Sequence, residues 1–509
     1  MASDQTTSSY TLDEALLSVG FGKFQYLVLA YAGVGWISDA MEMMLLSFVG
    51  PAVHSQWSLS AQQESLVTSV VFIGMLVGAY TWGLVSDTLG RRKAFLFSAM
   101  VISGAGLLST IAPNYRALLV FRCFVGFGLG GAPVLLSWFV EFVPAPRRGT
   151  WLVIFQAFWS IGSVIESSLA WIVMPRLGWR FLLGFSALPS LFLVAFYIMT
   201  PESPRYLCSK GDKKAALQIL EKMAKANGRE LPSGVLITNH ETELQQQHIS
   251  LPIDGVELSS SNPEETKPCQ KLKGPFMKAL RSLSMLLSRK LVRPTLLLWA
   301  LFIANAFSYY GIVLLTTELN NRSRSCSSPT KVTSHKPDDI NYKNVFAASF
   351  AEFPGLVLAG LIVDRIGRKR TMGGMLFICC TFLLPLVFHR YSAGVTTALL
   401  FGARACISTT FTTVYIYAPE IYPTSLRSTG VGAGSSMGRI GGMICPLVAV
   451  GLVQGCHQTA ALGLFTGVPF IAAICALLLP FETKGLALAD NISNDKLQTP
   501  NVVKSSQDQ

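Results

Sequence analysis

Apolar residues run in long blocks along the chain, separated by short polar loops and by one long polar stretch. Each block is close to the ~20 residues that a helix needs to cross a bilayer. We expect twelve such helices, near residues 27–50, 65–85, 95–113, 117–140, 150–173, 180–200, 294–317, 344–364, 371–389, 395–418, 429–453 and 459–480. The pattern therefore predicts an all-α membrane protein, with six helices on each side of the long polar stretch.

Polar segments divide the rest of the chain. Thr11 and Glu14 have the spacing of a capping box that opens a short helix, and 213–227 has helical periodicity. Residues 249–273, rich in Ser, Pro and Glu, and the tail after residue 491 are expected to lack structure. The expected parts are a cytoplasmic N-terminus (1–26), a first six-helix bundle (27–200), a cytoplasmic linker (201–293), a second six-helix bundle (294–480) and a cytoplasmic tail (481–509).

Composition agrees with a membrane protein. The chain is 51% hydrophobic and only 14% charged, with a mean hydropathy of +0.45, whereas soluble domains carry about 25% charged residues. The net charge of +12 is therefore assigned to loops outside the membrane, and not to a nucleic-acid surface.

Basic residues in short loops indicate the orientation. Arg91, Arg92, Arg148, Arg368 and Arg427 all fall on one side if both termini are cytoplasmic, and the opposite loops 51–64 and 454–458 lack Lys and Arg. The loop 318–343 does carry basic residues, which weakens the rule there. It also holds the sequon at Asn321, and glycosylation there would agree with an outer face.

Charged motifs repeat between the two halves of the chain. G-L-V-S-D-T-L-G-R-R at 83–92 returns as G-L-I-V-D-R-I-G-R-K at 360–369, an offset of 277 residues. Glu141 precedes Arg148 by seven residues, as Glu420 precedes Arg427, an offset of 279. P-E-S-P-R at 201–205 and P-F-E-T-K at 480–484 end the sixth and twelfth segments. The halves are therefore expected to be parallel repeats, related by an axis along the membrane normal.

These motifs resemble the major facilitator superfamily, in its sugar-porter and organic-ion branch, over residues 11–485. Within that branch, T-L-D-E-A-L at 11–16, G-F-G-K-F-Q at 20–25 and W-I-S-D-A-M-E-M at 36–43 resemble the niacin-transporter group and the relatives of the synaptic vesicle glycoproteins. The short loop 51–64 departs from animal organic-cation transporters, and A-N-A-F-S-Y-Y-G at 304–311 departs from the sugar motif of sugar porters.

The resemblance implies a gating role for the charged loop motifs. Pairs of carboxylates and guanidinium groups that bridge different helices would latch the cytoplasmic side when the pore opens outward, and break when it opens inward. The alternative is that the basic residues only set the orientation. The expected gating residues are Asp87, Arg91, Arg92, Glu141, Arg148, Glu202, Asp364, Arg368, Glu420, Arg427 and Glu482.

Ionisable residues inside the apolar blocks need a separate explanation, because each costs ~2.5–3.5 kcal/mol at mid-bilayer on insertion scales. The resemblance to proton-coupled sugar porters implies an ion pair between Asp39 and Arg122 whose protonation drives the conformational change; the alternative is a static pair. Glu42 is the second candidate for the proton carrier. Glu166 and Glu352 rank below it, since either could pair with Arg439.

Aromatic and polar residues at mid-depth are candidates for the substrate site. Aromatic faces suit a flat ring or a quaternary ammonium, and a carboxylate would need a donor such as Arg439. The stretch Ser-Tyr-Tyr-Gly at 308–311 is expected to interrupt its helix. The candidates, any of which could instead face lipid, are Trp36, Gln156, Trp159, Asn305, Tyr309, Tyr310, Tyr415 and Arg439.

The prediction is a monomeric secondary transporter of a small organic ion, with nicotinate or a related pyridine or quaternary-nitrogen compound as substrate and protons as the coupling ion. A sugar or polyol symporter and a non-transporting receptor or scaffold of the same fold stay open. No cofactor, metal cluster or catalytic motif is recognised, which excludes an enzyme. A Cys326–Cys456 disulfide is open, and the plasma membrane is favoured over the vacuolar membrane.

Overall fold

The computed structural model describes residues 9–144, 148–237, 284–289, 291–319, 342–389, 391–422, 426–455 and 457–484. Within them, eleven helices are long and apolar enough to cross a membrane, and the shorter apolar stretch Trp179–Ala195 takes the place of a twelfth. The described part of the chain is almost wholly helical, and each of the twelve predicted blocks corresponds to a helix or a pair of consecutive helices.

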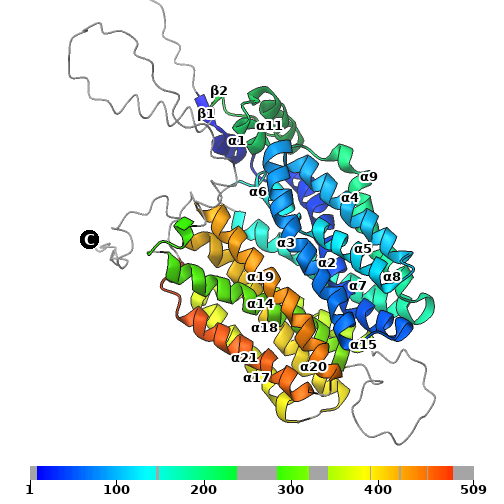
Figure 1. Cartoon of the computed structure of the whole chain (residues 1–509). Helices are drawn as coiled ribbons and strands as arrows, with labels where there is room; N and C mark the ends of the chain where they lie inside the picture. The colour runs from blue at the N-terminus through cyan, green and yellow to red at the C-terminus, as the bar shows by residue number, and fades with distance from the viewer. Residues whose placement is uncertain are drawn as a thin grey trace, which may run out of the picture.

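The first half holds six of these helical stretches (Figure 1). Four are single continuous helices, and the fourth and sixth stretches are each split into two short helices. In chain order they are α2 (Lys23–Trp57), α3 (Ala61–Leu89), α4 (Arg91–Thr110), α5 (Tyr115–Leu129) with α6 (Ala132–Val140), α7 (Arg148–Leu177), and α8 (Trp179–Ser186) with α9 (Leu188–Ala195).

The second half repeats the arrangement beside the first (Figure 1). Its helices are α14 (Val292–Leu319), α15 (Tyr342–Ser349) with α16 (Glu352–Ile366), α17 (Arg368–Phe388), α18 (Ala393–Ile421), α19 (Arg427–Ala449) with α20 (Gly451–Gln454), and α21 (Gln458–Leu477). One hydrophobic core belongs to this half alone, with Leu301, Leu376 and Phe465 among its fully buried members.

Close helix packing in the first half depends on glycine. A Cβ on Gly78 of α3 would lie 2.0 Å from the carbonyl oxygen of Phe127 in α5, and a Cβ on Gly126 of α5 would lie 2.1 Å from that of Val71 in α3. Small residues let two helix backbones approach in a membrane, where association depends on packing. The α3–α5 pair is therefore held at backbone contact distance.

A small layer outside the helix bundle joins the N-terminus to the segment after the sixth helical stretch. Strand β1 (Ser9–Thr11) pairs in parallel with β2 (Val235–Ile237). The capping box predicted at Thr11 is confirmed at the start of α1 (Leu12–Val19), and the periodicity at 213–227 is confirmed as α11 (Lys213–Asn227). Asn227 accepts a hydrogen bond from the Phe24 amide (3.0 Å) and so attaches this layer to the first turn of α2. The sequence pattern did not predict the two strands. η2 (Tyr197–Met199) and α10 (Pro204–Ser209) complete the connection.

Contacts between the two halves concentrate at one end of the molecule. We call the end that holds the 89–91 and 366–368 turns the basic end, and the opposite one the far end. The hydrogen bonds described between the halves lie at mid-depth or toward the far end, such as Ser69 to the Met443 carbonyl (2.9 Å) and Gln454 to Glu64 (2.7 Å). A hydrophobic core shared by both halves, with Phe48 and Val345 among its members, lies at the same end. The halves are therefore held together at the far end.

Candidate proton, substrate and gating sites

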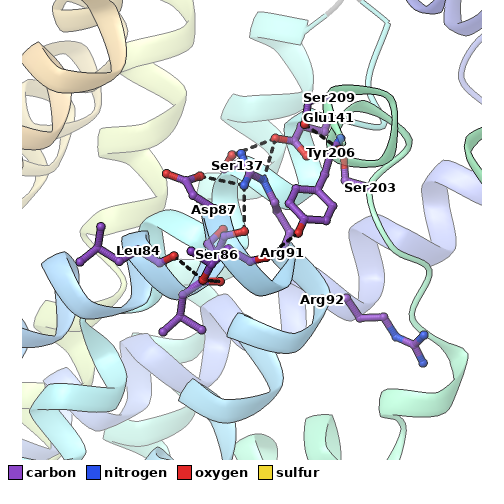
Figure 2. A network of polar contacts seen from close by, with 12 residues as sticks. Leu84, Ser86, Asp87, Arg91, Arg92, Ser137, Glu141, Ser203, Tyr206 and Ser209 are labelled. Atoms are coloured by element: carbon purple, nitrogen blue, oxygen red, sulfur yellow. Dashed lines mark hydrogen bonds and ion pairs between the residues drawn. The ribbon is translucent and has the colours of Figure 1, made fainter. Parts of the chain in front are cut away.

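The repeated loop motif of the first half forms one polar cluster at the basic end (Figure 2). The Arg91 guanidinium contacts Asp87 (2.9 Å) one turn earlier and Glu141 (3.3 Å) at the end of α6, and donates to the Ser86 carbonyl (3.0 Å). Its face lies over the Tyr206 ring, 5.3 Å from the centroid. Burial and the nearby Glu202 carboxylate raise the pKa of the Tyr206 phenol. Arg91 thus connects α3, α4, α6 and α10.

Glu202 closes the same cluster from another side. Its carboxylate accepts a hydrogen bond from the Arg92 amide (3.1 Å) at the N-terminus of α4, where the helix dipole favours a negative charge. The turn before it needs glycine, because Gly90 has φ +101° and a Cβ there would lie 2.4 Å from a Glu202 oxygen. The Arg92 guanidinium lies over the Tyr197 ring, 4.4 Å from the centroid, and donates to the Tyr197 carbonyl (3.4 Å).

The second half reproduces this geometry. Arg368 contacts Asp364 (3.1 Å) and Glu420 (3.2 Å), as Arg91 contacts Asp87 and Glu141. Glu482 accepts from the amides of Arg368 (2.7 Å) and Lys369 (3.1 Å), as Glu202 does at α4. Gly367 has φ +100°, almost identical to Gly90. The sequence repeat is therefore also a repeat of hydrogen bonding.

Gly90→Ala and Gly367→Ala are expected to destabilise the protein by about 1–3 kcal/mol each, because an L-residue is strained at this φ and its Cβ would displace the capping carboxylate. The measurement is the melting temperature of the purified variants. Gly360→Ala is the matched control, since Gly360 has nothing within 4 Å of its added Cβ. Equal melting temperatures for Gly367→Ala and Gly360→Ala would refute the assignment.

The remaining gating candidates are less connected. Arg148 donates to the Val143 carbonyl (3.3 Å), while Glu141 accepts from Arg91. The side chain of Arg427 lies outside the described residues. Among the ion pairs that the structure describes, those of the gating residues lie within one half, so a latch between halves stays a prediction for another conformation.

Two buried ion pairs lie in the membrane-spanning part. Arg122 of α5 pairs with Glu42 of α2 (2.9 Å), and both side chains are essentially inaccessible. The expected Asp39–Arg122 pair is not formed. Asp39 lies one turn earlier on α2, and no described side chain forms a hydrogen bond with it. The rotation of α2 about its axis determines which acid pairs with Arg122, because it directs Glu42 toward α5.

The second pair joins Arg404 of α18 to Glu352 of α16 (2.7 Å). Tyr309 of α14 also donates to Glu352 (2.7 Å). Glu352 therefore does not serve as a partner for Arg439, and neither does Glu166, which accepts from Ser186 (2.8 Å). The sequence analysis considered Glu352 as a partner of Arg439 and did not indicate its pair with Arg404.

Seven of the eight substrate candidates form one connected chain between the halves. Trp36 donates to Gln156 (2.8 Å) and its ring lies 5.6 Å from Trp159, whose N–H donates to the Tyr309 hydroxyl of the other half (2.8 Å). Tyr309 continues to Tyr310 (ring centroids 5.2 Å apart) and, through Phe411, to Tyr415. Aromatic faces and phenol groups therefore extend across the interface of the two halves at mid-depth.

Arg439 stands at the end of this chain on α19. Tyr415 and Arg439 share contacts to the Ser435 hydroxyl (3.3 and 2.9 Å). Arg439 is 8% exposed, its Nε has no hydrogen-bond partner, and the groups that act on its charge are the phenols of Tyr415, Tyr310 and Tyr80. In the part of the chain that the structure describes, no carboxylate balances this guanidinium.

Asn305 does not join the chain. Its amide donates to the Leu301 carbonyl (2.9 Å) and accepts from Thr410 (2.6 Å), so it fastens α14 to α18. The predicted interruption at 308–311 is wrong, because α14 is continuous from Val292 to Leu319. Helix breaks occur elsewhere, at Gly130–Gly131 between α5 and α6 and at Ala187 between α8 and α9. Asn321, Cys326 and Cys456 lie outside the described residues.

Comparison with known proteins agrees with this architecture. Residues 27–252 match the model of the family described as "Sugar (and other) transporter", and residues 338–499 match that of the Major Facilitator Superfamily. The chain is 58% identical to organic cation/carnitine transporter 7 of Arabidopsis thaliana over 491 residues, which are 96% of this chain and 97% of the relative. It belongs to the major facilitator superfamily.

More distant relatives show the same fold. The synaptic vesicle 2-related protein of Xenopus laevis is 36% identical over 96% of this chain and 83% of its own length. The inward open conformation of the xylose transporter XylE from E. coli superposes with a TM-score of 0.67 at 15% identity, covering 91% of this chain and 98% of that one. Membership of the superfamily makes this chain a multi-pass membrane protein and a secondary transporter, not an enzyme, built as two bundles of six helices.

Proposed function

We propose that this transporter carries small organic acids that also contain a ring or quaternary nitrogen, with nicotinate as the first candidate, and that protons drive the transport. The observation that carries the proposal is Arg439, a buried guanidinium without a described carboxylate partner beside the phenols of Tyr310 and Tyr415. A buried cation without a partner is costly, and a substrate carboxylate would relieve that cost.

The chain of aromatic side chains supports a ring or a quaternary nitrogen as the second element of the proposed substrate. Nicotinate offers a flat electron-poor ring for the faces of Tyr309, Tyr310 and Tyr415, next to a carboxylate for Arg439. Carnitine, a zwitterion in the name of the Arabidopsis relative, has the same two elements, with a quaternary ammonium in place of the ring. Carnitine is therefore the second candidate.

The pair Glu42–Arg122 supports proton coupling. When Glu42 is ionised, the pair is neutral overall and stays buried; when it is protonated, Arg122 loses its partner and the packing between α2 and α5 changes. This replaces the Asp39–Arg122 pair expected from the sequence. Protons and substrate would then act in different halves, with Glu42 in the first and Arg439 in the second.

The membrane topology belongs to the same proposal. The basic turns at 89–91 and 366–368 would face the cytoplasm with both termini, and the plasma membrane is the first candidate location. Since the halves are joined at the far end, the structure would then correspond to an inward-facing conformation. Arg91 and Arg368 would then latch the halves only in the opposite conformation, after the basic end closes.

Arg439→Gln is expected to reduce nicotinate uptake into proteoliposomes by about 10- to 100-fold, the worth of a charge-assisted hydrogen bond in a buried site. Nicotinamide, which has the same ring without the carboxylate, should compete poorly with wild type. The matched control is Arg116→Gln, an exposed arginine at the start of α5.

Three results would reject this substrate class. They are nicotinate uptake that survives in Arg439→Gln, equal competition by nicotinamide and nicotinate, and saturable hexose uptake that nicotinate does not inhibit. The last would favour the sugar or polyol symporter. A wild-type protein that moves none of these compounds would favour the receptor or scaffold.

A further inference from the structure

A small cavity lies inside the first half, and all the residues that line it belong to that half. It is enclosed by α2, α4, α9 and the junction of α5 with α6, and its volume is about 10 Å³. This is close to the space that one water-sized particle needs. Its polar lining consists of the side chains of Asp39, Ser38, Ser98 and Ser190.

The oxygens around this cavity keep lone pairs that are free to accept. Ser98 already donates its hydrogen to the Phe95 carbonyl (2.8 Å), and Ser190 donates to the Ala187 carbonyl (2.8 Å), so their free lone pairs remain. The Ser38 hydroxyl is buried and has no hydrogen-bond partner. Asp39 is 7% exposed and forms no described hydrogen bond. A carboxylate in a buried, acceptor-rich cavity requires a positive charge.

Neighbouring charges do not supply it. The charged group that acts on Asp39 is Glu42, another carboxylate. Arg122 is engaged with Glu42 at 2.9 Å, and Glu166, a further buried acid of this half, is bonded to Ser186. Of Asp39, Glu42 and Glu166, only Glu42 is thus paired with the Arg122 guanidinium.

Two helix breaks lie beside the cavity. Two lining elements are discontinuous helices: α5 ends at Leu129 before α6 begins at Ala132, and α8 ends at Ser186 before α9 begins at Leu188. Gly128 and Gly131, on either side of the first break, line the cavity. The Gly128 carbonyl accepts from the Gly131 amide (2.8 Å) and the Gly131 carbonyl from the Val134 amide (2.9 Å), so the ligands of a bound cation would come from the side chains.

We propose that this cavity binds a single Na⁺, with Asp39 and the hydroxyls of Ser38, Ser98 and Ser190 as its side-chain ligands. Hard cations take oxygen ligands, and one carboxylate with neutral oxygens balances a single charge, whereas Ca²⁺ needs more ligands and Mg²⁺ keeps several waters. A cavity for one water-sized particle admits Na⁺ and excludes Cs⁺ and choline by size. The site lies wholly within one half and is independent of the proposed substrate.

The test uses the full-length purified protein in lipid nanodiscs. Thermal unfolding is followed in choline chloride, with choline replaced stepwise by NaCl, KCl or CsCl at constant ionic strength, and ²²Na⁺ binding is counted directly. We expect Na⁺ to raise the melting temperature saturably and Cs⁺ to leave it unchanged. Asp39→Asn should abolish both the shift and the ²²Na⁺ counts, and Ser38→Ala should weaken the apparent Na⁺ affinity by about tenfold.

Matched controls are available in the same half. Ser47→Ala removes a buried hydroxyl of α2 that bonds the Met44 carbonyl (2.8 Å) and lies outside the cavity, and Glu166→Gln removes a buried carboxylate outside it. Both should keep the Na⁺ response. If Asp39→Asn does not fold, wild-type ²²Na⁺ counts and Ser38→Ala against Ser47→Ala decide the question.

The proposal is overturned if wild type has the same melting temperature in NaCl and choline chloride and binds no ²²Na⁺. It is also overturned if Asp39→Asn keeps the Na⁺ response. A melting temperature that changes with pH in wild type but not in Asp39→Asn, and that does not respond to Na⁺, would overturn it as well, because Asp39 would then hold a proton and not a cation. None of these results bears on nicotinate uptake, so failure here is distinguishable from failure of the proposed function.

Discussion

Glu42→Gln is expected to abolish accumulation of substrate against its gradient while leaving exchange close to the wild-type rate. Glutamine keeps the shape and one acceptor for Arg122, but it cannot take up and release a proton. With one proton per substrate, a pH difference of about one unit drives about tenfold accumulation. The variant should therefore equilibrate its substrate instead of concentrating it.

The measurement is nicotinate uptake into proteoliposomes, with an imposed pH gradient and, separately, in counterflow at equal pH. Glu166→Gln is the matched control, since Glu166 is equally buried in the same half but bonds Ser186 and not Arg122. It should keep the response to the gradient. Undiminished gradient-driven accumulation in Glu42→Gln would exclude Glu42 as the proton carrier.

Gly78→Ala is expected to give the largest loss of stability of any single methyl addition in α3. The added carbon would lie 2.0 Å from the backbone carbonyl oxygen of Phe127, and a backbone atom of a packed helix cannot move aside as a side-chain end can. Overpacking of this kind costs about 1–3 kcal/mol and occasionally more. Separation of α3 from α5 would also disturb Arg122, which lies on α5.

The check is thermal unfolding and monodispersity of the purified variant. Gly83→Ala lies five residues further along the same helix, where nothing is within 4 Å of the added carbon, and should behave as wild type. If Gly78→Ala and Gly83→Ala unfold at the same temperature, the contact between α3 and α5 is looser than the structure shows.

Helix positions and the repeat were predictable because their signals are local. A block of apolar residues near ~20 long determines a spanning helix by itself. The loop motifs at 83–92 and 360–369 contain their own glycine turn, cap and ion pair, so identical spacing produced nearly identical geometry at Gly90 and Gly367. The two strands were missed because Ser9–Thr11 and Val235–Ile237 are three residues each and far apart in sequence.

Pairing inside the membrane was not predictable in the same way. Asp39 and Glu42 are three residues apart, which places them only about 60° apart around a helix of 3.6 residues per turn. Which of them faces Arg122 depends on the rotation of α2 against α5, and packing sets that rotation. The pair Glu352–Arg404 spans 52 residues and two helices, so it was equally invisible in a single sequence.

The substrate candidates were chosen by residue type and depth, and the structure brings most of them together. Trp36, Trp159, Tyr309 and Tyr415 come from helices of both halves and meet in one chain. Asn305 was chosen by the same criterion but does not join the chain. A polar residue at mid-depth can also serve helix packing, and the Asn305 amide is hydrogen-bonded between α14 and α18.

The two charged clusters at the basic end have an energetic consequence. Arg91 and Arg368 each form ion pairs within their own half. Separating the halves at that end therefore leaves neither guanidinium without its carboxylate partner. At the far end, a swing in the opposite sense must give up hydroxyl contacts such as Ser167 to Ser349 (2.7 Å) and Ser69 to Met443. These are neutral bonds of modest strength, about 1 kcal/mol each, which a bound solute or proton can outweigh. In this conformation the far end is thus held closed by several separate hydrogen bonds, including that of Gln454 to the Glu64 carboxylate, and by no ion pair between the halves among the described residues.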